Sequence, residues 1–258
     1  PGDLPARLDA DDGDGDQDMI IGDFLGNVKF GSKTGVYYRD QIEFPFFNYW
    51  LKGVGSPNLP EALVLYGIWS ATAGEAEIRA LFPAARPATE RTVLVELDGR
   101  RVWVAWVYGA AMASSHAHLA AVLGARSILQ VGSYGGLATD GKVGDVLVPS
   151  RVLGKDGVSR QQSKGVPIDM DPGLRARLNA ALVAGGATTI DGLLISTTTI
   201  SLERDSDVRR WLRAGYAGVE MEAAATAAMA RHFDVPTAGA FVLWDNIGVG
   251  HTIFTRTD

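Results

Sequence analysis

The segment GVEMEAAA, residues 218–225, holds two carboxylates whose spacing suits the recognition of a sugar. Glu220 and Glu222 flank Met221, and the alanine-rich stretch that follows is typical of a buried helix. The dipole of such a helix favours an ionised carboxylate at its N-terminus. An ionised carboxylate only accepts hydrogen bonds, and it can take them from two neighbouring hydroxyl groups. We therefore expect Glu222 to remain ionised and to bind a vicinal diol such as that of a ribose.

Two further polar positions follow apolar runs of the kind that form buried strands. Asp245 comes directly after the run GAFVLW, residues 239–244, and partial burial there would raise its pKa. A carboxyl with a raised pKa can serve as a general acid. The turn VGSYGG, residues 131–136, offers the Ser133 hydroxyl and a backbone that a ligand can approach closely at Gly135. Together these positions predict a site formed where strand ends open into loops.

From residue 61 onward, strand patterns alternate with helix patterns. The sequence DG at 98–99 between two alternating apolar runs predicts a β-hairpin. We expect strands within 61–69, 91–109, 127–137, 142–153, 192–200 and 236–246, and helices within 73–82, 113–125, 171–186 and 223–233. Such alternation indicates an α/β fold with helices layered on a central sheet.

The charge of the chain is concentrated near its start. Residues 1–18 contain seven Asp and one Arg, so they account for the whole net charge of −6. The remainder is neutral and offers no general electrostatic attraction to nucleic acid. We expect an acidic N-terminal arm at 1–18, an aromatic-rich extension at 19–60 and one catalytic domain at 61–258.

The acidic arm also has a weak similarity to a calcium-binding loop. Asp12, Asp14 and Asp16 alternate as the ligands of such a loop do, but Gln17 occupies the position that requires glycine. Asp23 would also have to replace the closing glutamate. A solvated acidic arm is therefore the favoured interpretation.

The amino-acid composition also excludes several kinds of site and indicates where in the cell the protein functions. The chain has no cysteine, which excludes disulfides, thiolate metal sites and a cysteine nucleophile. It has no apolar stretch long enough to span a bilayer and no apolar segment typical of a secretory signal. We expect a cytoplasmic protein without a membrane or nucleic-acid partner.

Three segments together resemble the nucleoside phosphorylase/nucleosidase superfamily over about residues 61–248. They are QVGSYGGLATDGKVGDVLVPSRV (130–152), GVEMEAAATAAMARHFDVP (218–236) and the strand that ends at Asp245. The resemblance implies a three-layer α/β sandwich with a central mixed sheet that cleaves the N-glycosidic bond of nucleosides. It also implies a homo-oligomer, a dimer or a hexamer, and no metal or organic cofactor.

The resemblance assigns roles to individual residues. Glu222 would hold the ribose diol, Met221 would pack against the sugar, and Glu220 would support Glu222 from behind. Asp245 would protonate or hydrogen-bond a purine base at N7. Ser133 and the glycine turn would assist the attacking nucleophile.

Members of the family use either phosphate or water as the nucleophile. The sequences of the two loops that distinguish these classes favour water in this chain. Phosphorylases carry arginines in the loop after the first strand and directly before VGS, whereas this chain has no such arginine in the first loop and has Gln130 before VGS. A neutral amide replaces a guanidinium poorly as a phosphate ligand. Arg86 or Arg91 could still supply a phosphate contact across a subunit boundary.

The segment AGEAEI, residues 73–78, resembles the acidic segment of methylthioadenosine/S-adenosylhomocysteine nucleosidases. That match makes Glu77 the base that activates water, with Glu75 as the alternative if the register moves. Hydrolysis of a purine-type nucleoside is the leading hypothesis. Phosphorolysis is the second, and the third is a catalytically inactive nucleoside-binding member of the fold.

Two departures from the family pattern affect the base pocket. Trp244 stands where the family has a serine, and Ile200 stands where it has an aromatic residue that stacks on the base. We expect both side chains at the pocket, where they would alter specificity or activity.

Overall fold

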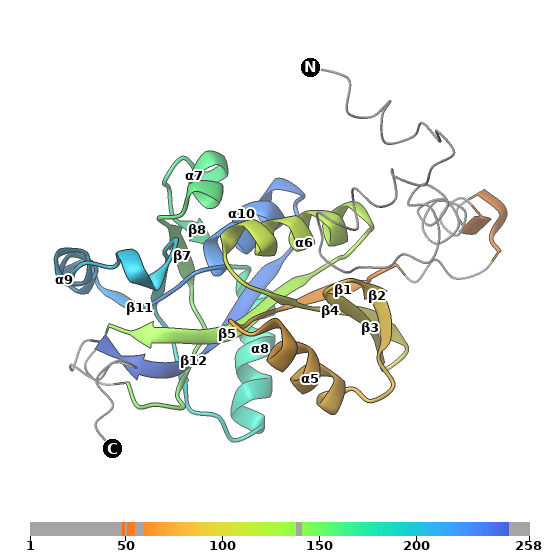
Figure 1. Cartoon of the computed structure of the whole chain (residues 1–258), viewed down its shortest axis with the longest axis horizontal. Coiled ribbons are helices and arrows are strands. Elements are labelled where there is room, and N and C mark those ends of the chain that lie inside the picture. The colour runs from red at the N-terminus through yellow and green to blue at the C-terminus, as the bar shows by residue number, and fades with distance from the viewer. Residues whose placement is uncertain (1–47, 50, 55–58, 138–140, 248–258) are drawn as a thin grey trace, which may run out of the picture. The chain divides into compact units, whose positions relative to one another are not determined.

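A mixed β-sheet forms the centre of residues 59–258 in the computed structural model (Figure 1). Its main path runs β2 (Arg86–Thr89), β3 (Thr92–Leu97), β4 (Arg100–Val107), β1 (Ala62–Gly67), β5 (Ile128–Gly136), β11 (Tyr216–Glu220), β10 (Leu193–Ser196), β7 (Arg151–Gly154) and β8 (Ile168–Asp169). A branch leaves β5 through β12 (Thr237–Asn246), β6 (Val146–Leu147) and β9 (Thr189–Ile190).

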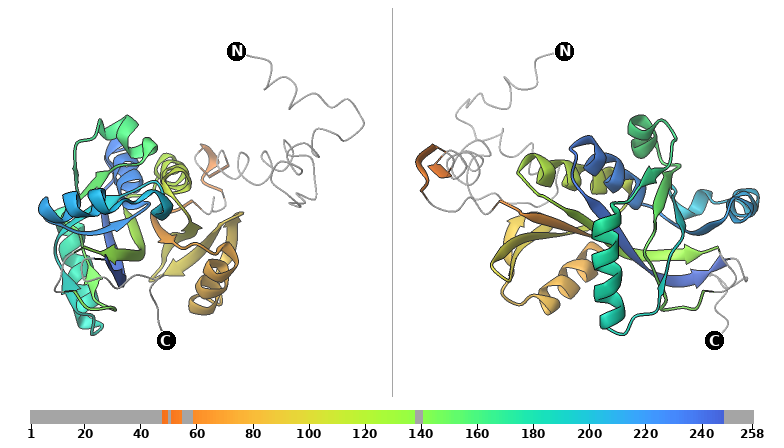
Figure 2. Two further views of the ribbon diagram at one scale, coloured as in Figure 1. Left: turned by 60° about the vertical axis from the view of Figure 1, so that its left-hand side comes forward. Right: turned by 180° about the vertical axis from the view of Figure 1, so that it is seen from behind.

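Helices cover both faces of this sheet. One face carries α6 (Ala110–Val122), α10 (Ala223–His232) and α7 (Gly157–Ser163), and the other carries α5 (Ala71–Leu81) and α8 (Pro172–Ala184) (Figures 1 and 2). The short η2 (Ile200–Leu202) and α9 (Asp205–Arg213) precede β11. This arrangement confirms the three-layer α/β sandwich expected from the sequence.

The structure describes residues 48–49, 51–54, 59–137 and 141–247. The chain divides into two units, Pro1–Asn58 and Leu59–Asp258. In the first unit, residues 48–49 and 51–52 are helical. The acidic arm with its calcium-loop pattern, and most of the aromatic-rich extension, lie outside the described residues. Among the helices of the described part, none is long and apolar enough to cross a membrane.

Strand β1 separates two hydrophobic cores because its side chains alternate between the faces of the sheet. Leu63 and Leu65 pack into the core that includes Ala113 and Ala117 of α6. Tyr66 packs into the core on the other face, which includes Ile78 of α5. Because consecutive strand residues point to opposite faces, Gly67, which follows Tyr66, faces the same side of the sheet as Leu63 and Leu65.

Local sequence signals explain several element boundaries. The hairpin between β3 and β4 turns at Asp98 and Gly99, whose φ values of 49° and 74° are those of the predicted type of turn. Helix α8 begins with Pro172, and the side chain of Asp171 accepts a hydrogen bond from the Leu174 N–H to cap it. Gly124, with φ of 103°, directly follows the C-cap of α6 and ends that helix.

Several elements differ from the expectation. The strand expected over 142–153 is two separate strands, β6 and β7, which pair with different neighbours. Helices α7 and α9 and strands β2, β8, β9 and β11 were not predicted. In α9 the buried Trp211 and the partly buried Val208 and Leu212 pack into the core that contains Val219 of β11.

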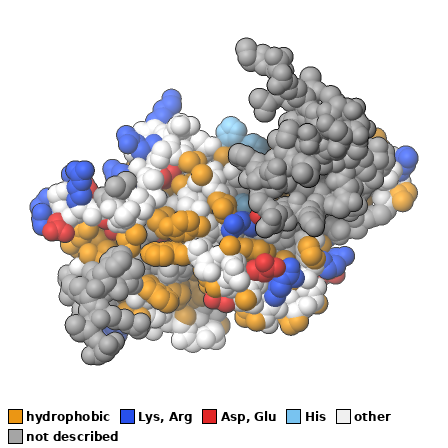
Figure 3. Space-filling model, viewed as in Figure 1, with side chains coloured by type: hydrophobic (Ala, Val, Ile, Leu, Met, Phe, Trp, Pro, Cys, Tyr) orange, Lys and Arg blue, Asp and Glu red, His pale blue; other side chains and the backbone are white. Residues whose placement is uncertain are grey.

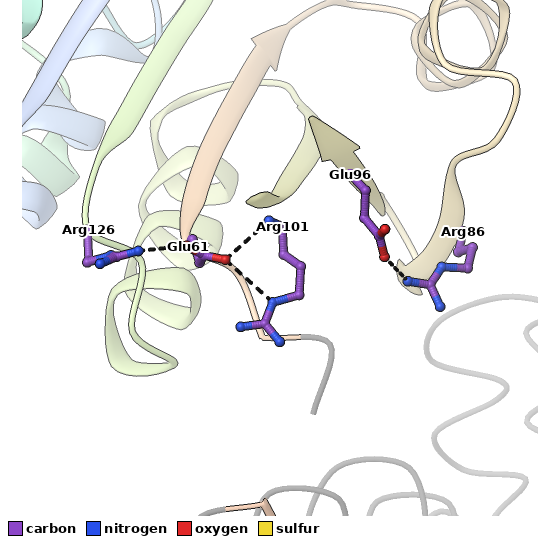
Figure 4. A network of polar contacts seen from close by, with 5 residues as sticks. All are labelled: Glu61, Arg86, Glu96, Arg101 and Arg126. Carbon is purple, nitrogen blue, oxygen red and sulfur yellow. Dashed lines mark hydrogen bonds and ion pairs between the residues drawn. The ribbon is translucent and has the colours of Figure 1, made fainter. Parts of the chain in front are cut away.

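An acidic residue joins three strands at their start. The Glu61 carboxylate lies 2.6 Å from Nη2 of Arg126, which precedes β5, and 3.8 Å from Nε of Arg101 on β4 (Figure 4). The Arg101 backbone N–H also donates to it, and this bond contributes most to holding the pKa of Glu61 below its usual value. These contacts align β1, β4 and β5 at the edge from which their parallel strands set out.

Candidate functional site

Glu222 lies where two strands end and two helices begin. It follows β11 and directly precedes α10, and its side chain is buried. Its Oε1 accepts a hydrogen bond of 2.5 Å from the N–H of Gly109, the residue before α6. Its Oε2 lies against Gly67, the last residue of β1, where an added Cβ would come within 3.2 Å. Glycine at position 67 is therefore what leaves room for this carboxylate.

The sheet opens at this place because β5 changes its partner. On one edge β5 pairs with β1 as far as Val131, and it then pairs with the antiparallel β11 from Gly135. Gly132, between these two stretches, lies close to the Gly67 backbone. The ends of β1 and β11 therefore point toward each other, and such a change of strand partner is where ligands bind in open α/β sheets.

Glu220 faces away from this opening and caps helix α10. Its Oε2 accepts hydrogen bonds of 2.7 Å from the backbone N–H groups of Glu222 and Ala223. The Ser196 hydroxyl donates to Oε1, and the same Ser196 oxygen accepts a 2.8 Å hydrogen bond from the Ala224 N–H. Three N–H groups at the start of α10 are thus satisfied, and the backbone of Glu222 is fixed. Glu220 supports Glu222 and makes no contact with the opening through these bonds.

Burial changes the protonation of the two acids. It raises the pKa of Glu220 to about 8, with the nearby charge of Glu222 adding to the effect. It raises the pKa of Glu222 to about 7, against the opposing hydrogen bond from Gly109. The expectation that the helix dipole keeps Glu222 ionised was incomplete, because desolvation outweighs it. Burial and the proximity of the two carboxylates therefore both favour protonation of the pair.

Asp245 lies on β12, where the pairing with β5 shifts between Leu243 and Asp245. Its Oδ1 would come within 3.2 Å of a Cβ placed on Gly135. Gly135 is three residues beyond Gly132 along β5, a separation of about 10 Å.

A second acid beside Asp245 was not anticipated from the sequence. Glu203 directly follows η2 and is half-buried. Burial, together with the negative charge of Asp245, raises its pKa to about 7. The only signal in the sequence is a carboxylate after the run STTTISL, and a charged loop residue ordinarily indicates a solvated position. Two acids, Glu203 and Asp245, thus lie near each other at the carboxyl end of β5.

The other residues that were predicted to contact the substrate differ in the solvent exposure of their side chains. Met221 is buried between the two glutamates, and Ile200 is half-buried at the start of η2. Gly135 is half-buried against Asp245, and Ser133 is exposed one residue after Gly132. Trp244 is 64% exposed on β12, so the side chain that precedes Asp245 projects into solvent in this chain.

Glu77 lies on the opposite face of the sheet from Glu222. The Tyr66 hydroxyl donates a hydrogen bond of 2.6 Å to Oε2 of Glu77, and Tyr66 faces α5. The next residue, Gly67, faces Glu222, because consecutive strand residues point to opposite faces. Glu75, the alternative base, pairs with Arg79 at 2.8 Å on α5. The contacts of Glu77 and Glu222 thus lie on opposite faces of β1, and Glu75 is engaged by Arg79 within its own helix.

Gln130 is buried on the same side as Glu222. Its Oε1 accepts a 2.8 Å hydrogen bond from the Thr226 hydroxyl of α10, and its Nε2 would lie 3.4 Å from a Cβ on Gly67. The side chain is therefore fixed by α10 and presents an uncharged amide. Arg86, one of the two arginines considered as phosphate ligands, pairs at 2.9 Å with Glu96 on β3. Arg91, the other, lies between β2 and β3.

Residues 66–255 match the family model described as the phosphorylase superfamily, and this span includes the opening and every acid around it. The chain belongs to the phosphorylase superfamily. Among solved structures, it is similar to purine nucleoside phosphorylase from Toxoplasma gondii in complex with immucillin-H. The TM-score is 0.67 at 18% identity, covering 78% of this chain and 84% of that one. No curated protein sequence gives a significant match.

The similarity to the solved phosphorylase establishes the fold alone at this identity. The family model confirms the resemblance found in the sequence. Within the described residues, no three His, Asp or Glu side chains gather as metal ligands would.

Proposed function

We propose that this chain cleaves the N-glycosidic bond of a purine-type nucleoside and that water accepts the sugar. The observation that carries the proposal is the Glu222 carboxylate. Its backbone is fixed by Glu220, its Oε1 is held by Gly109, and its Oε2 lies at the opening between β1 and β11. An acceptor fixed in this way suits the hydroxyl groups of a ribose.

Glu222 would act on the sugar as positive charge develops there. Departure of the base gives the sugar an oxocarbenium-like character in the transition state. An ionised Glu222 that accepts hydrogen bonds from the diol stabilises this charge and orients the ring. Because burial raises the pKa of Glu222 to about 7, we expect sugar binding to strengthen as the pH rises through that value.

Asp245 and Glu203 would act on the leaving base. Burial and the charge of Asp245 raise the pKa of Glu203 to about 7, so the pair retains a proton near neutral pH. A carboxyl that donates this proton to the purine makes the base a better leaving group. A positioned acid of this kind increases the rate of bond cleavage about 10²- to 10⁴-fold.

Gln130 favours water over phosphate as the acceptor. Its amide oxygen is engaged by Thr226, and it carries no charge where the resemblance expects an arginine. A phosphate dianion there would lack the bidentate guanidinium that usually binds it. The proposed hydrolysis does not depend on Glu77, whose role as base remains a prediction from the sequence.

Phosphorolysis is the second candidate, favoured by the similarity in fold to a purine nucleoside phosphorylase. The two reactions differ in their requirement for phosphate. Base release from adenosine and inosine should be followed by chromatography in phosphate-free buffer and again with added inorganic phosphate. Release that proceeds equally in both buffers supports hydrolysis, and release that requires phosphate supports phosphorolysis.

Two variants test the assigned acids. Asp245→Asn should reduce base release by at least about 10²-fold while nucleoside binding is retained. Glu222→Gln should weaken both binding and release. Glu96→Gln, which changes an exposed acid on β3, is the matched control and should behave as the parent chain. An Asp245→Asn variant with unchanged release would refute the assignment of the acid, and binding without release in the parent chain would indicate an inactive nucleoside-binding protein.

A further inference from the structure

A cavity lies between helix α8 and the edge of the sheet at β9, and none of the acids assigned to the proposed reaction lines it. It encloses about 320 Å³, at the lower end of the range of small-molecule sites, which is about 300 to 1,000 Å³. Helix α8 lies along the sheet, but every one of its residues keeps some exposure to solvent (Figure 2). The helix therefore leaves space beside it that a compact ligand can fill.

One wall of the cavity is a single face of α8, and the other is the end of the branch of the sheet. Arg175 and Asn179 are four residues apart on α8, so both point to the same side of that helix. Thr189 on β9 pairs with Val146 of β6, which packs in one core with leucines of α8, so Thr189 faces α8 as well. Asp191 is two residues beyond Thr189 and returns to that face. Four polar side chains from distant segments therefore line one cavity.

The guanidinium of Arg175 is held in place and is only partly used. Its Nη2 donates to the Val148 carbonyl at 3.1 Å and to Oδ1 of Asp191 at 2.7 Å. Its Nε is buried and has no acceptor within the described part of the chain. Lys and Arg side chains project from the surface over α7 and α9 in Figure 3, whereas the side chain of Arg175 is only 20% exposed. The cavity thus presents a fixed cation with hydrogen-bond donors to spare.

The groups around Arg175 complete a neutral but strongly polar lining. The side chain of Asp191 is 70% exposed, and Arg175 engages only one of its two oxygens. Among the described residues, the Asn179 amide and the Thr189 hydroxyl have no hydrogen-bond partner. The rest of the lining is mainly apolar and includes Val148, Pro172 and Ala176. A ligand that satisfies these groups carries an anionic acceptor, a cationic donor and a small apolar part.

We propose that this cavity binds a free α-amino acid with an apolar side chain. The carboxylate of the ligand accepts hydrogen bonds from the remaining N–H groups of Arg175 and from the Asn179 amide, and charge-assisted bonds of this kind are strong. The ammonium group of the ligand donates to the second oxygen of Asp191. A zwitterion has one charge of each sign, as the Arg175–Asp191 pair has, so binding leaves no charge unpaired on either side. This inference does not rest on the proposed function.

Calorimetric titration of the full chain with L-leucine tests the site. The dissociation constant should be about 1 mM or lower. N-acetyl-L-leucine lacks the ammonium group and L-leucinamide lacks the carboxylate, so each should bind at least about tenfold more weakly than leucine. Absence of leucine binding up to about 10 mM, or equal affinities for the three compounds, would overturn the proposal.

Variants of the lining locate the binding. Arg175→Met and Asp191→Asn should each weaken leucine binding at least about tenfold, and Asn179→Ala at least about threefold. Asn179 is exposed, so its replacement tests the site even if Arg175→Met does not fold. Arg151→Met is the matched control, because it breaks the 2.6 Å ion pair with Asp169 outside this cavity and should leave leucine binding unchanged. Leucine binding that is unchanged in Asp191→Asn and Asn179→Ala, or that Arg151→Met weakens equally, would overturn the assignment.

Discussion

Replacing Ser196 by alanine tests whether the start of α10 is built as described. The Ser196 side chain is fully buried on β10, next to Glu220 on β11. Its hydroxyl donates to Glu220, and its oxygen accepts the Ala224 N–H at 2.8 Å. The substitution removes both bonds and leaves a carboxylate oxygen and a backbone N–H buried without these partners.

The expected magnitude follows from these two lost bonds. A buried polar group without its partner costs about 1–3 kcal/mol. Two such groups should lower the free energy of unfolding by roughly 2–4 kcal/mol, since relaxation recovers part of the loss. For a unit of this size, each kcal/mol shifts the midpoint of thermal unfolding by about 2–4 °C, so we expect a decrease of roughly 5–15 °C.

Calorimetry and urea unfolding of the full chain measure this loss. Ser115→Ala is the matched control, because Ser115 is exposed on α6 and its hydroxyl bonds only the Ala111 carbonyl within its own helix. The control should stay within about 0.5 kcal/mol of the parent chain. A loss below about 1 kcal/mol for Ser196→Ala, equal to that of the control, would refute the capping role of Ser196 and Glu220.

The pH dependence of the loss gives a second check. The hydrogen bond from Ser196 lowers the pKa of Glu220 against the effect of burial, which raises it to about 8. The bond therefore stabilises the ionised carboxylate. The destabilisation by Ser196→Ala should grow as the pH rises from 6 toward 9, and a loss that shrinks over this range would contradict the reasoning.

Three further changes probe other parts of the molecule. Gly67→Ala would place a Cβ 3.2 Å from Oε2 of Glu222, so we expect about tenfold weaker nucleoside binding, measured by calorimetry, with little change in thermal stability. Glu203→Gln should lower base release at every pH and abolish its decline above about pH 7, because burial and the charge of Asp245 raise the pKa of Glu203 to about that value and an amide has no carboxyl proton to donate. Glu61→Gln should destabilise the chain above the ordinary glutamate pKa of 4.5 and cease to do so in acid, because the pKa of Glu61 is lowered and its ion pairs are lost on protonation.

Each of these changes has its own control or contrary result. Gly157→Ala adds a methyl group where nothing lies within 4 Å, so it should leave binding unchanged. A pH profile of Glu203→Gln identical to that of the parent chain would exclude Glu203 as the titrating acid. A constant difference in stability between Glu61→Gln and the parent chain from pH 3 to pH 7 would show that the ion pairs at Glu61 are not what stabilises the fold.

Local signals made the layered fold predictable. The hairpin at Asp98 and Gly99 and the proline that begins α8 are recognised from a few consecutive residues. Asp245 could also be selected because it follows an apolar strand pattern, and Glu222 because it precedes an alanine-rich helix pattern. What was predicted correctly is therefore what short stretches of chain determine by themselves.

The remaining features depend on contacts between distant segments. Glu77 and Glu222 both stand near strand ends, but alternation along β1 places the partner of Glu77 and the contact of Glu222 on opposite faces. Ser196 became recognisable only when β10 paired with β11 and brought it to Glu220. Glu203 has a raised pKa because tertiary packing buries it beside Asp245, and nothing in its neighbouring sequence indicates this.

Strand β1 has the stabilising ion pairs of Glu61 at one end and the contact of Gly67 with Glu222 at the other. Strand β1 has six residues and is about 20 Å long, with Glu61 before its first residue and Gly67 at its last. A change that strengthens the arginine contacts of Glu61 is thus a whole strand length away from the carboxylate of Glu222. An engineer could raise the heat tolerance of this protein at one end of β1 and redesign its selectivity at the other, and the two sets of substitutions should combine additively.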